Sequence, residues 1–478
     1  MPHPLIKELE IPINLGLNKA LDEVGLRGYA AALQDCIVDE EGNVHRRPGL
    51  TSLCDLGTNA AIDGLYWWPE QEWAIAISDG ETYKITDNSG TNSQISGDSF
   101  QAGTRVIFGN YGTALYAANG AKILKIPNSG NVAEIGDADA PTAVTHPVVL
   151  DTYLLANEVD SEKCHYSKVG DPDDWPGDFV SAEAKTDTLL AQITANLELY
   201  LLGKRTLEVW RNDGSTPFVR ELQGYIETGT IAAYSFALCG GVLYWLDNER
   251  NVVRMTPDSR TPQVISVTMN KYIQGFSTVS DALGDYIVIG GRPYYVLNFP
   301  TEEKTLVWDI INSKWYEWGY WDSVNAEYEN WLANCYCLAE SWNLALVGDR
   351  TTGKVYKLDT TAYDDDGDTL RTLIRTPHLG YEAESVRKIS HKLTFRVKRT
   401  NVVDTASVTS MTIRYRDNGS STWQNQRTVA LAQVGDTEFR GTLLRNGSFY
   451  TRQYEFVLSD DTPLALISVK DLVEYCTS

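Results

Sequence analysis

Short apolar strands joined by tight turns recur along the first three quarters of the chain. Residues 73–86 and 113–126 share one plan, in which an apolar strand, a tight turn and an alternating strand follow one another. Their turns, Asp79-Gly80 and Asn119-Gly120, are dipeptides that two-residue hairpins favour, because both central positions need positive φ. The two turns lie 40 residues apart. This spacing is typical of a repeat in which each unit is one small β-sheet.

The same plan recurs more loosely at five further turns. These are centred on Asn157, Gly203-Lys204, Asp247-Asn248, Gly290-Gly291 and Gly348-Asp349. Hairpins too small to bury their own faces, repeated at nearly constant spacing, indicate radial packing around an axis. We therefore predict an all-β protein with a six- or seven-bladed β-propeller over residues 51–363. The long step before the last turn leaves the blade count open. The helical signal is poor, and residues 7–23 are expected to hold one short helix.

The pattern changes after residue 363. Residues 364–369 are acidic and rich in turn formers, which predicts a linker. Residues 370–478 then alternate apolar and polar positions, as strands with one buried face do. We predict a C-terminal antiparallel β-sandwich there. Residues 1–50 are expected to form an N-terminal arm that leads into the propeller.

The charge of the chain is unevenly distributed. It has 41 Lys and Arg against 64 Asp and Glu, a net charge of −23, which argues against binding nucleic acid by neutralising phosphates. Residues 370–478 carry 15 basic and 11 acidic residues, so nearly all the acidity belongs to the predicted propeller. The negative electrostatic potential of so acidic a region either keeps a protein soluble or repels DNA from a channel wall. The 43% hydrophobic content is sufficient for a sizeable core.

The cysteines and the N-terminal residues point to a reducing compartment. Seven scattered cysteines do not form a disulfide framework. The first residues lack the pattern of a secretory signal, and no apolar run is long enough for a membrane span. We expect a protein assembled in a cytosol-like space, without a membrane span.

Signatures of catalysis and cofactor binding are weak. The pair Cys335 and Cys337 has no second pair of ligands nearby, so we interpret both as ordinary strand residues. The alternating Asp364, Asp366 and Asp368 could offer oxygens to calcium, but they do not fit the EF-hand spacing, and a solvated linker is favoured. The six histidines show no metal-binding spacing, and neither a nucleophile elbow nor a P-loop occurs. We predict no catalytic residue, metal or cofactor.

One turn in the C-terminal part resembles an Asp-box. In residues 415–423, Asp417, Gly419, Thr422 and Trp423 have the spacing of that hairpin turn, which occurs in sialidases and other propellers. There the Asp orients the turn backbone, the Gly permits a positive φ, and the Trp packs beneath. We interpret this copy as a structural hairpin.

A tryptophan-rich run supports a glycan-directed alternative. Trp308, Trp315, Trp318 and Trp321 could stack on sugar rings, as flat aromatic faces do. A glycosidase would also need two facing carboxylates, which the sequence can neither exclude nor nominate. The competing interpretation is that these side chains wedge between blades. A lectin or glycosidase is therefore our alternative function, and a third hypothesis is an intracellular protein scaffold.

Four stretches of the chain resemble the tail hub or nozzle proteins of short-tailed bacteriophages, also called packaged-DNA stabilisation proteins. The first resemblance is the early segment that closes with Arg47, Pro48 and Gly49 before the first blade. The others are the strand pair at residues 201–221, the Gly-led strands at 229–246, and the C-terminal part with its Asp-box-like turn. This family has no invariant catalytic motif, so no active-site residue is carried over.

The resemblance implies a structural virion protein rather than an enzyme. Members of this kind form a ring of several copies, which we expect to be a hexamer, below the portal and its adaptor ring. The ring would extend the DNA channel, help to retain the packaged genome, and carry fibres, spikes or a needle plug. Double-stranded DNA would pass through without specific binding. The expected location is the phage tail, after assembly in the host cytoplasm.

Overall fold

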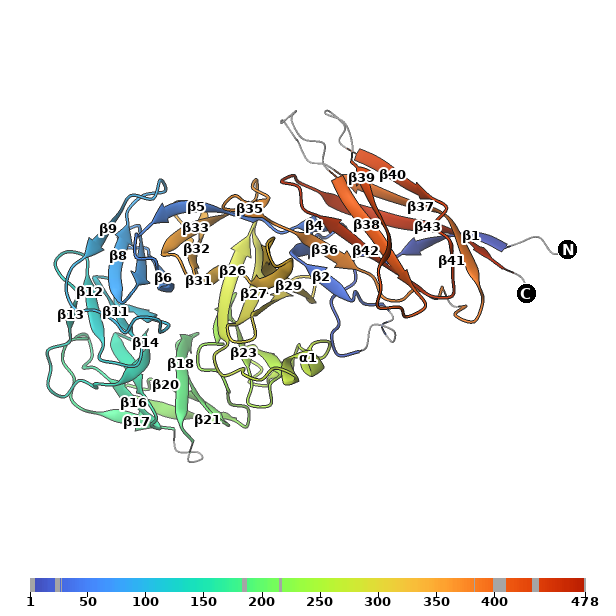
Figure 1. Ribbon diagram of the computed structural model, residues 1–478. Coiled ribbons are helices and arrows are strands. Elements are labelled where there is room, and N and C mark those ends of the chain that lie inside the picture. Colours follow the sequence, from blue (N-terminus) through green and yellow to red (C-terminus); the bar gives the residue numbers. More distant parts are fainter. Residues whose placement is uncertain are drawn as a thin grey trace.

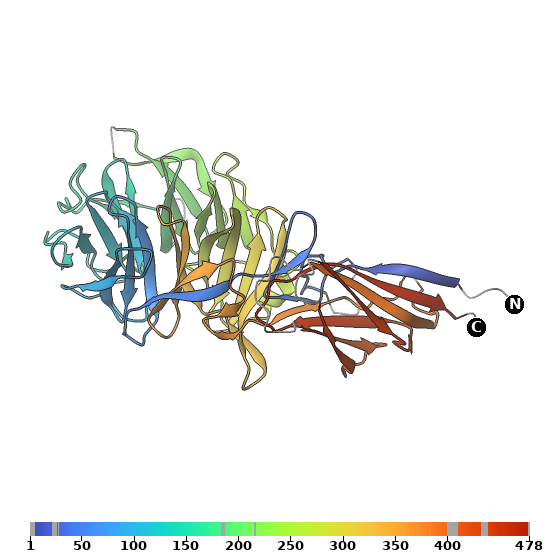
Figure 2. The same cartoon turned by 90° about the horizontal axis from the view of Figure 1, so that it is seen from above.

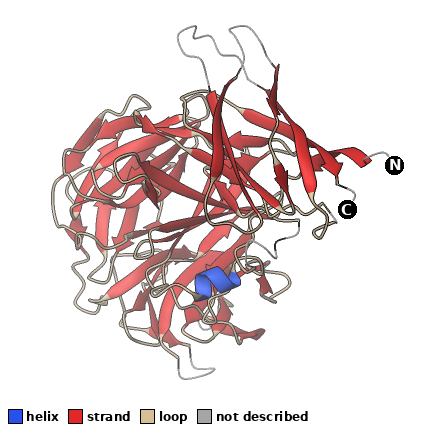
Figure 3. Cartoon of the chain, turned by 45° about the vertical axis from the view of Figure 1, so that its right-hand side comes forward, coloured by secondary structure: helices blue, strands red, loops and turns tan. Residues whose placement is uncertain are grey.

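The chain folds into strands almost throughout. The computed structural model describes residues 5–21, 26, 28–182, 187–214, 217–381, 383–398, 410–431 and 438–476. Within these, the one α-helix is α1 (Asn270–Gln274), and no helix is long and apolar enough to cross a membrane. Figure 1 shows a ring of small sheets beside a second group of strands, with both termini at the far end of that second group. Figure 3 shows how completely strands dominate.

Six blades of the ring are each built from four consecutive antiparallel strands. The first three blades are β6 (Ile62–Trp68), β7 (Trp73–Ser78), β8 (Glu81–Ile85) and β9 (Asn92–Ile95); β10 (Ile107–Asn110), β11 (Ala114–Ala118), β12 (Leu124–Pro127) and β13 (Ala133–Glu134); and β14 (Val144–Leu150), β15 (Tyr153–Glu158), β16 (Lys163–Tyr166) and β17 (Phe179–Ser181). The next three are β18 (Leu189–Ala195), β19 (Glu198–Gly203), β20 (Leu207–Arg211) and β21 (Val219–Ile226); β22 (Ala237–Cys239), β23 (Val242–Leu246), β24 (Val252–Met255) and β25 (Gln263–Val264); and β26 (Leu283–Ile289), β27 (Arg292–Phe299), β28 (Lys304–Asp309) and β29 (Lys314–Asp322).

A composite unit closes the ring. It consists of β31 (Ala333–Ala339), β32 (Leu344–Asp349) and β33 (Lys354–Asp359), with β5 (Gly49–Asp55), at the end of the N-terminal arm, as the fourth strand. The chain thus enters and leaves the propeller in the same sheet. The prediction of an all-β propeller of six or seven blades, with further antiparallel sheets, is confirmed: six blades are continuous in sequence, and this composite sheet completes the circle.

One predicted hairpin occupies a different place in its blade from the others. The turn at Gly290-Gly291 joins β26 to β27, the first two strands of the sixth blade, whereas Asp79-Gly80 and Asp247-Asn248 each join a second strand to a third. The equivalent turn in the sixth blade lies at residues 300–303. The long step of the repeat therefore arises partly from counting the wrong hairpin of one blade.

Polar side chains cross the axis of the propeller. Arg105, just before the second blade, pairs with Asp285 of the sixth blade at 2.6 Å and donates to the carbonyl oxygen of Asn334 in the composite sheet. The ring of His146 in the third blade stacks on Tyr234, just before the fifth blade, at 5.0 Å between centroids. These contacts join side chains from different blades near the centre of the ring.

The second group of strands forms two sheets packed face to face. One sheet has the order β3 (Cys36–Val38), β4 (Val44–Arg46), β43 (Ala465–Tyr475), β37 (Lys388–Lys398) and β40 (Glu438–Leu444), with β1 (Leu5–Ile11) also on β43 and β41 (Ser448–Phe449) on β37. The other has the order β2 (Ala32–Gln34), β36 (Thr372–Arg375), β42 (Arg452–Leu458), β38 (Ser410–Asp417) and β39 (Gln424–Ala430). Alternate residues such as Phe395 and Phe456 point inward and are buried. Figure 2 shows this sandwich extending from one side of the propeller.

The N-terminal arm is shared between both parts. Its strand β2 pairs with β36 and, in parallel, with β29 of the sixth blade, so one sheet runs from the propeller into the sandwich. The short helix expected over residues 7–23 is wrong: residues 5–11 form β1, paired along its length with β43, and Glu23 lies outside the described residues. The paired partner strand, more than 450 residues away, overrides a local pattern that fits a helix. The boundaries at residues 50, 363 and 369 stay predictions.

Candidate functional site at the junction of propeller and sandwich

Two consecutive arginines of the arm reach in opposite directions. Arg46 ends β4, and Arg47 follows it, so the alternation of an extended chain sends one side chain toward the sandwich and the other toward the propeller. Both are buried, at 4% and 0% exposure. A buried guanidinium needs hydrogen-bond acceptors, and each nitrogen of both side chains has at least one.

Arg47 joins three segments that are distant in sequence. Its guanidinium pairs with Asp365 at 2.6 Å and with Asp35 at 2.7 Å, and it donates to the carbonyl oxygen of Gly319 at 3.0 Å. Asp35 in turn accepts from the backbone N–H of Gly319 at 2.9 Å. The ring of Trp331 lies 5.6 Å from the guanidinium carbon. The arm, the sixth blade and the strands after the propeller are thereby fixed to one cation.

The buried charges shift each other's titration. Burial raises the pKa of Asp35 to about 6, although the charge and hydrogen bond of Arg47 oppose that shift. Burial alone would lower the pKa of Arg47, but the charges of Asp365 and Asp35 outweigh it and raise the pKa. The arginine therefore stays protonated at every relevant pH, and it is Asp35 that can change charge.

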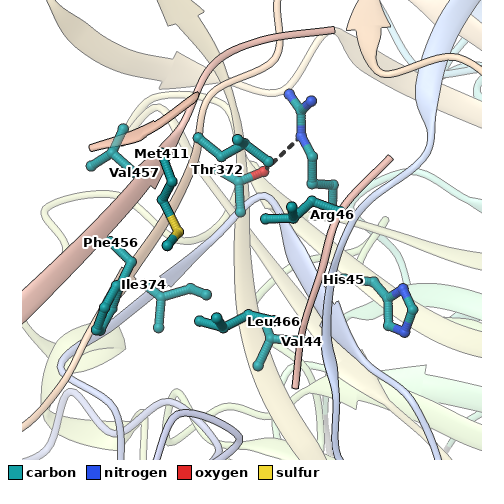
Figure 4. Close-up of a pocket in the computed structure, with 11 residues that line it drawn as sticks. Val44, His45, Arg46, Thr372, Ile374, Met411, Phe456, Val457 and Leu466 are labelled. Carbon is teal, nitrogen blue, oxygen red and sulfur yellow. Dashed lines mark hydrogen bonds between the residues drawn. The ribbon is translucent and has the colours of Figure 1, made fainter. Parts of the chain in front are cut away.

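Arg46 attaches the arm to the sandwich through oxygen atoms of the backbone. It donates to the carbonyl oxygens of Leu370, Asp460 and Thr462, and its Nε donates to the hydroxyl of Thr372 at 3.3 Å. Figure 4 shows this last bond at the rim of an apolar pocket. The pocket is lined by side chains that include Val44, Ile374, Met411, Phe456 and Leu466. Burial lowers the pKa of Arg46 to about 10.

The two residues after the arginines fit the same junction. Pro48 is buried, and as a proline it has no backbone N–H that would need a partner there. Gly49 approaches the next segment so closely that a Cβ would lie 2.1 Å from the carbonyl oxygen of Asp364. Its N–H donates to the carbonyl oxygen of Ala362 at 2.9 Å. The sequence singled out Arg47, Pro48 and Gly49 by resemblance, and the structure places all three at this junction.

The partners of Arg47 were missed by the sequence reasoning. Asp365 belongs to the segment interpreted as a solvated linker, yet it is 1% exposed, and its strand β34 (Asp364–Asp365) pairs with β5. For Asp365 that interpretation is wrong, because the carboxylate compensates a buried cation. Its neighbours do lie nearer to solvent, where Asp366 pairs with Lys354 at 2.7 Å and Asp368 accepts from Tyr320. Among the described residues, no group of three or more potential ligands could hold a metal ion.

The Asp-box-like turn joins β38 to β39 at the end of the sandwich. Gly419 has a φ of +72°, as the motif requires. Asp417 does not orient the turn through its side chain but forms a two-pronged pair with the buried Arg452, at 2.7 and 2.8 Å. Thr422 is exposed and its N–H donates to Ser420. Trp423 is half-buried against arginine side chains of the outer sheet face.

The tryptophans that motivated a glycan site are mostly inside the protein. Trp315 and Trp318 are each 1% exposed, and their indole N–H groups donate to the carbonyl oxygens of Ile265 and Cys36. Trp308 is 7% exposed. Three of the four rings therefore have no face available to a sugar. Cys335 and Cys337 are likewise buried, and burial raises the pKa of both thiols.

The propeller region matches a known protein family. The model of the phage-stabilisation family, described as Bacteriophage P22 Gp10, beta-propeller, matches residues 34–363. This chain belongs to that family. The match begins at Gln34, just before the junction residues, and ends with the last residue before the acidic segment. The expected resemblance to phage DNA-stabilisation proteins is thereby confirmed.

Other comparisons give only distant similarities. No curated protein matches the sequence. The extracellular domain of the putative one component system BT4673 from B. thetaiotaomicron is 10% identical with a TM-score of 0.44, over 88% of this chain and 61% of that one. The structure of U3-55K is 12% identical with a TM-score of 0.42, over 65% of this chain and 99% of that one. A complex described as YCF48 bound to D1 peptide is 10% identical with a TM-score of 0.41, over 66% of this chain and 98% of that one.

Proposed function

We propose that this protein is a structural component of the phage tail that forms the hub or nozzle ring below the portal and adaptor. In this role it extends the DNA channel, helps to retain the packaged genome and attaches fibres, spikes or a needle plug. It performs no chemical reaction in this proposal and needs no cofactor. The observation that carries it is the family match over residues 34–363.

The contacts near the centre of the propeller favour a channel formed between copies. Because Arg105 of one blade reaches Asp285 and Asn334 of two others, we place the path of DNA between chains and not through a single propeller. A DNA channel would then be enclosed by several chains around a common axis, and we propose six. The net charge of −23 suits a wall along which DNA slides without binding, because an acidic surface repels phosphates.

The buried junction supports a role that requires a rigid part. Arg47 links the arm, the sixth blade and Asp365 through charge-assisted bonds that solvent does not reach. A tail part that holds pressurised DNA has to transmit force without deforming. The glycan-directed alternative is not retained, because the structure buries Trp315 and Trp318, the residues on which it was to be tested.

The direct test is quantitative mass spectrometry of gradient-purified particles of the phage that encodes this chain. Peptides of this protein are compared with those of the major capsid protein. We expect a ratio equivalent to about six copies per particle. Absence of the protein from intact, DNA-filled particles would refute the tail assignment, and a ratio of hundreds of copies would refute the ring.

A further inference from the structure

A two-stranded hairpin at the end of the sixth blade carries like charges on one face. The first part of β29 pairs with β28, but its last four residues pair with β30 (Glu327–Asn330) instead. In this register Asp322 lies directly opposite Glu327, and Glu329 follows two residues later on the same face. We call residues 319–330 the acidic hairpin.

The carboxylates of the acidic hairpin are not compensated by cations. Asp322, Glu327 and Glu329 form no ion pair in the part of the chain that the structure describes. Desolvation, followed by the charges of Asp322, Glu303 and Glu327, raises the pKa of Glu329. Like charges that lie directly opposite each other destabilise a pair of strands. The arrangement of Asp322 and Glu327 therefore brings no stability to a single copy.

The other face of the acidic hairpin is fixed to the body of the protein. Trp321 and Tyr328 lie opposite each other on that face, and the guanidinium carbon of Arg371 is 4.2 Å from the centre of the Trp321 ring. The hydroxyl of Tyr328 donates to the carbonyl oxygen of Arg371 at 2.8 Å. The hairpin is thereby anchored, while Val324 at its tip is 89% exposed.

The sandwich has the opposite arrangement on the outer face of β37 and β40. Arg396 lies directly opposite Arg440, and Lys398 lies opposite Glu438. The neighbouring Phe395 is 0% exposed, so the alternation of a strand directs the charged side chains outward. We call Arg396, Lys398 and Arg440 the basic strip.

One carboxylate serves the three cations of the basic strip. Glu438 pairs with Arg396, and both are about half exposed. The side chains of Arg440 and Lys398 form no ion pair and no hydrogen bond with the described residues. The neighbour of Arg396 on β43 is the neutral Ser468, and among the described strands β40 is the last on its side of the sheet. Two arginines directly opposite each other repel, so this pair too brings no stability to a single copy.

We propose that the basic strip of one copy binds the acidic hairpin of a second copy. Within the described part of one chain, no hydrogen bond or ion pair joins these two surfaces, and the hairpin is held by other segments. Each surface repels itself when alone, and contact between copies brings the opposite charges together. The inference rests on the proposed ring and names two surfaces that would build it. Because the surfaces differ, the contact is head-to-tail, and such contacts close into a ring when the rotation allows.

Exposed apolar side chains beside both surfaces favour a protein as the partner over DNA. Leu444 lies on β40, on the same face as Arg440, and is 58% exposed. Val324 is exposed at the tip of the acidic hairpin. The centre of a protein interface buries such side chains, whereas a phosphate backbone gives them no apolar contact. The net charge of −23 also repels a polyanion as it approaches.

The test reverses one charge on each surface of the full-length chain. A phage lacking its own copy of the gene is complemented with each variant, and copies per particle are counted by mass spectrometry. Arg440→Glu changes the basic strip, Glu327→Lys changes the acidic hairpin, and a third chain carries both changes. Arg211→Glu is the matched control, because this arginine of the fourth blade is 58% exposed and belongs to neither surface.

We expect each single change to reduce the copies per particle by about fivefold or more. The chain with both changes should recover incorporation, because the reversed charges attract again, and Arg211→Glu should incorporate normally. Normal incorporation of either single variant would overturn the proposal, as would failure of the double change to restore the copy number. An equal loss in Arg211→Glu would also overturn it, since incorporation would then respond to any reversal of charge.

Thermal melting of the purified variants separates loss of the contact from misfolding. Each single reversal replaces a repelling pair of opposite residues by an attracting one. Arg440→Glu and Glu327→Lys should therefore melt at or above the temperature of the unaltered chain, although both fail to incorporate. A lower melting temperature in both variants would contradict the repulsion from which the contact is argued, and would overturn the proposal.

Two further results separate this inference from its alternatives. Normal copy number combined with loss of packaged DNA in Arg440→Glu would assign the basic strip to nucleic acid and overturn the protein contact. Absence of the unaltered protein from particles would refute the proposed function itself. Presence of the unaltered protein, together with normal copy numbers of both single variants, would refute this inference alone.

Discussion

Removing the Arg47 side chain should destabilise the protein far more than removing an exposed arginine. Arg47→Ala leaves the carboxylates of Asp35 and Asp365 buried without their cation and deprives the Gly319 carbonyl of a donor. Breaking a buried ion pair from one side typically costs about 3–5 kcal/mol, because the remaining charge is uncompensated. Since two carboxylates lose their partner here, we expect a value at the upper end of that range.

The matched control is Arg396→Ala, which makes the same substitution in the sandwich. Arg396 and its partner Glu438 are about half exposed, so their pair should contribute about 0–1 kcal/mol. Arg47→Lys provides an intermediate case, because an ammonium keeps the charge but cannot hold Asp365 through two parallel bonds. We therefore expect Arg396→Ala to be the most stable of the three variants, Arg47→Lys to be intermediate, and Arg47→Ala to be the least stable.

Urea-induced unfolding at pH 7, followed by tryptophan fluorescence, measures these differences. Trp331, one of 13 tryptophans in the chain, lies against the guanidinium of Arg47 and adds a signal from the junction to the total fluorescence. Hydrogen exchange of residues 31–50 adds a local measurement, since release of the arm should speed exchange there first. Equal unfolding free energies for Arg47→Ala and Arg396→Ala would refute the view that this cation holds the two parts together.

Three further predictions concern titration and close packing. The pKa of Asp35 is about 6 in the folded protein against 3.8 in the unfolded chain, so the contribution of Asp35 to stability declines as pH rises from about 4 to 6. In urea titrations, the stability of Asp35→Asn relative to the unaltered protein should therefore rise across that pH range. Burial lowers the pKa of His146 from 6.5 to about 4, so the pH dependence has the opposite sign: the contribution of His146 to stability is lost as pH falls from about 6.5 to 4. His146→Gln should therefore flatten the plot of unfolding free energy against pH over that range. Gly49→Ala should cost about 1–3 kcal/mol in the same assay, because the new Cβ meets the carbonyl oxygen of Asp364, whereas Gly136→Ala, with open space and an ordinary φ, should change stability by about 0.5 kcal/mol or less.

The propeller could be predicted because its information is local. Each blade repeats an apolar strand, a tight turn and a second strand, and turns such as Asp79-Gly80 restrict the backbone to one hairpin geometry. The family resemblance then extended this reading to the expected role. The hairpin at Gly290-Gly291 shows the limit of the method, since the sequence does not say which pair of strands in a blade a turn connects.

The junction could not be predicted because its partners are far apart in sequence. Asp35 and Arg47 lie in the arm, but Asp365 comes more than 300 residues later. An acidic run rich in turn formers looks like a solvated linker whether or not one carboxylate in it is buried. The only local signal was the pair of adjacent arginines in an extended segment, which must point in opposite directions.

The arm makes the two parts of the molecule mechanically continuous. The strand β5 at its end belongs to the last sheet of the propeller, while β1 and β4 belong to one sheet of the sandwich. Between them, β2 bridges β29 and β36, so hydrogen bonds run without interruption from the sixth blade to β39. A hinge motion between propeller and sandwich would have to break this sheet and, at the same time, expose Arg47 with its partners Asp35 and Asp365. Movements that accompany assembly or DNA release are therefore expected between copies of the chain rather than within one.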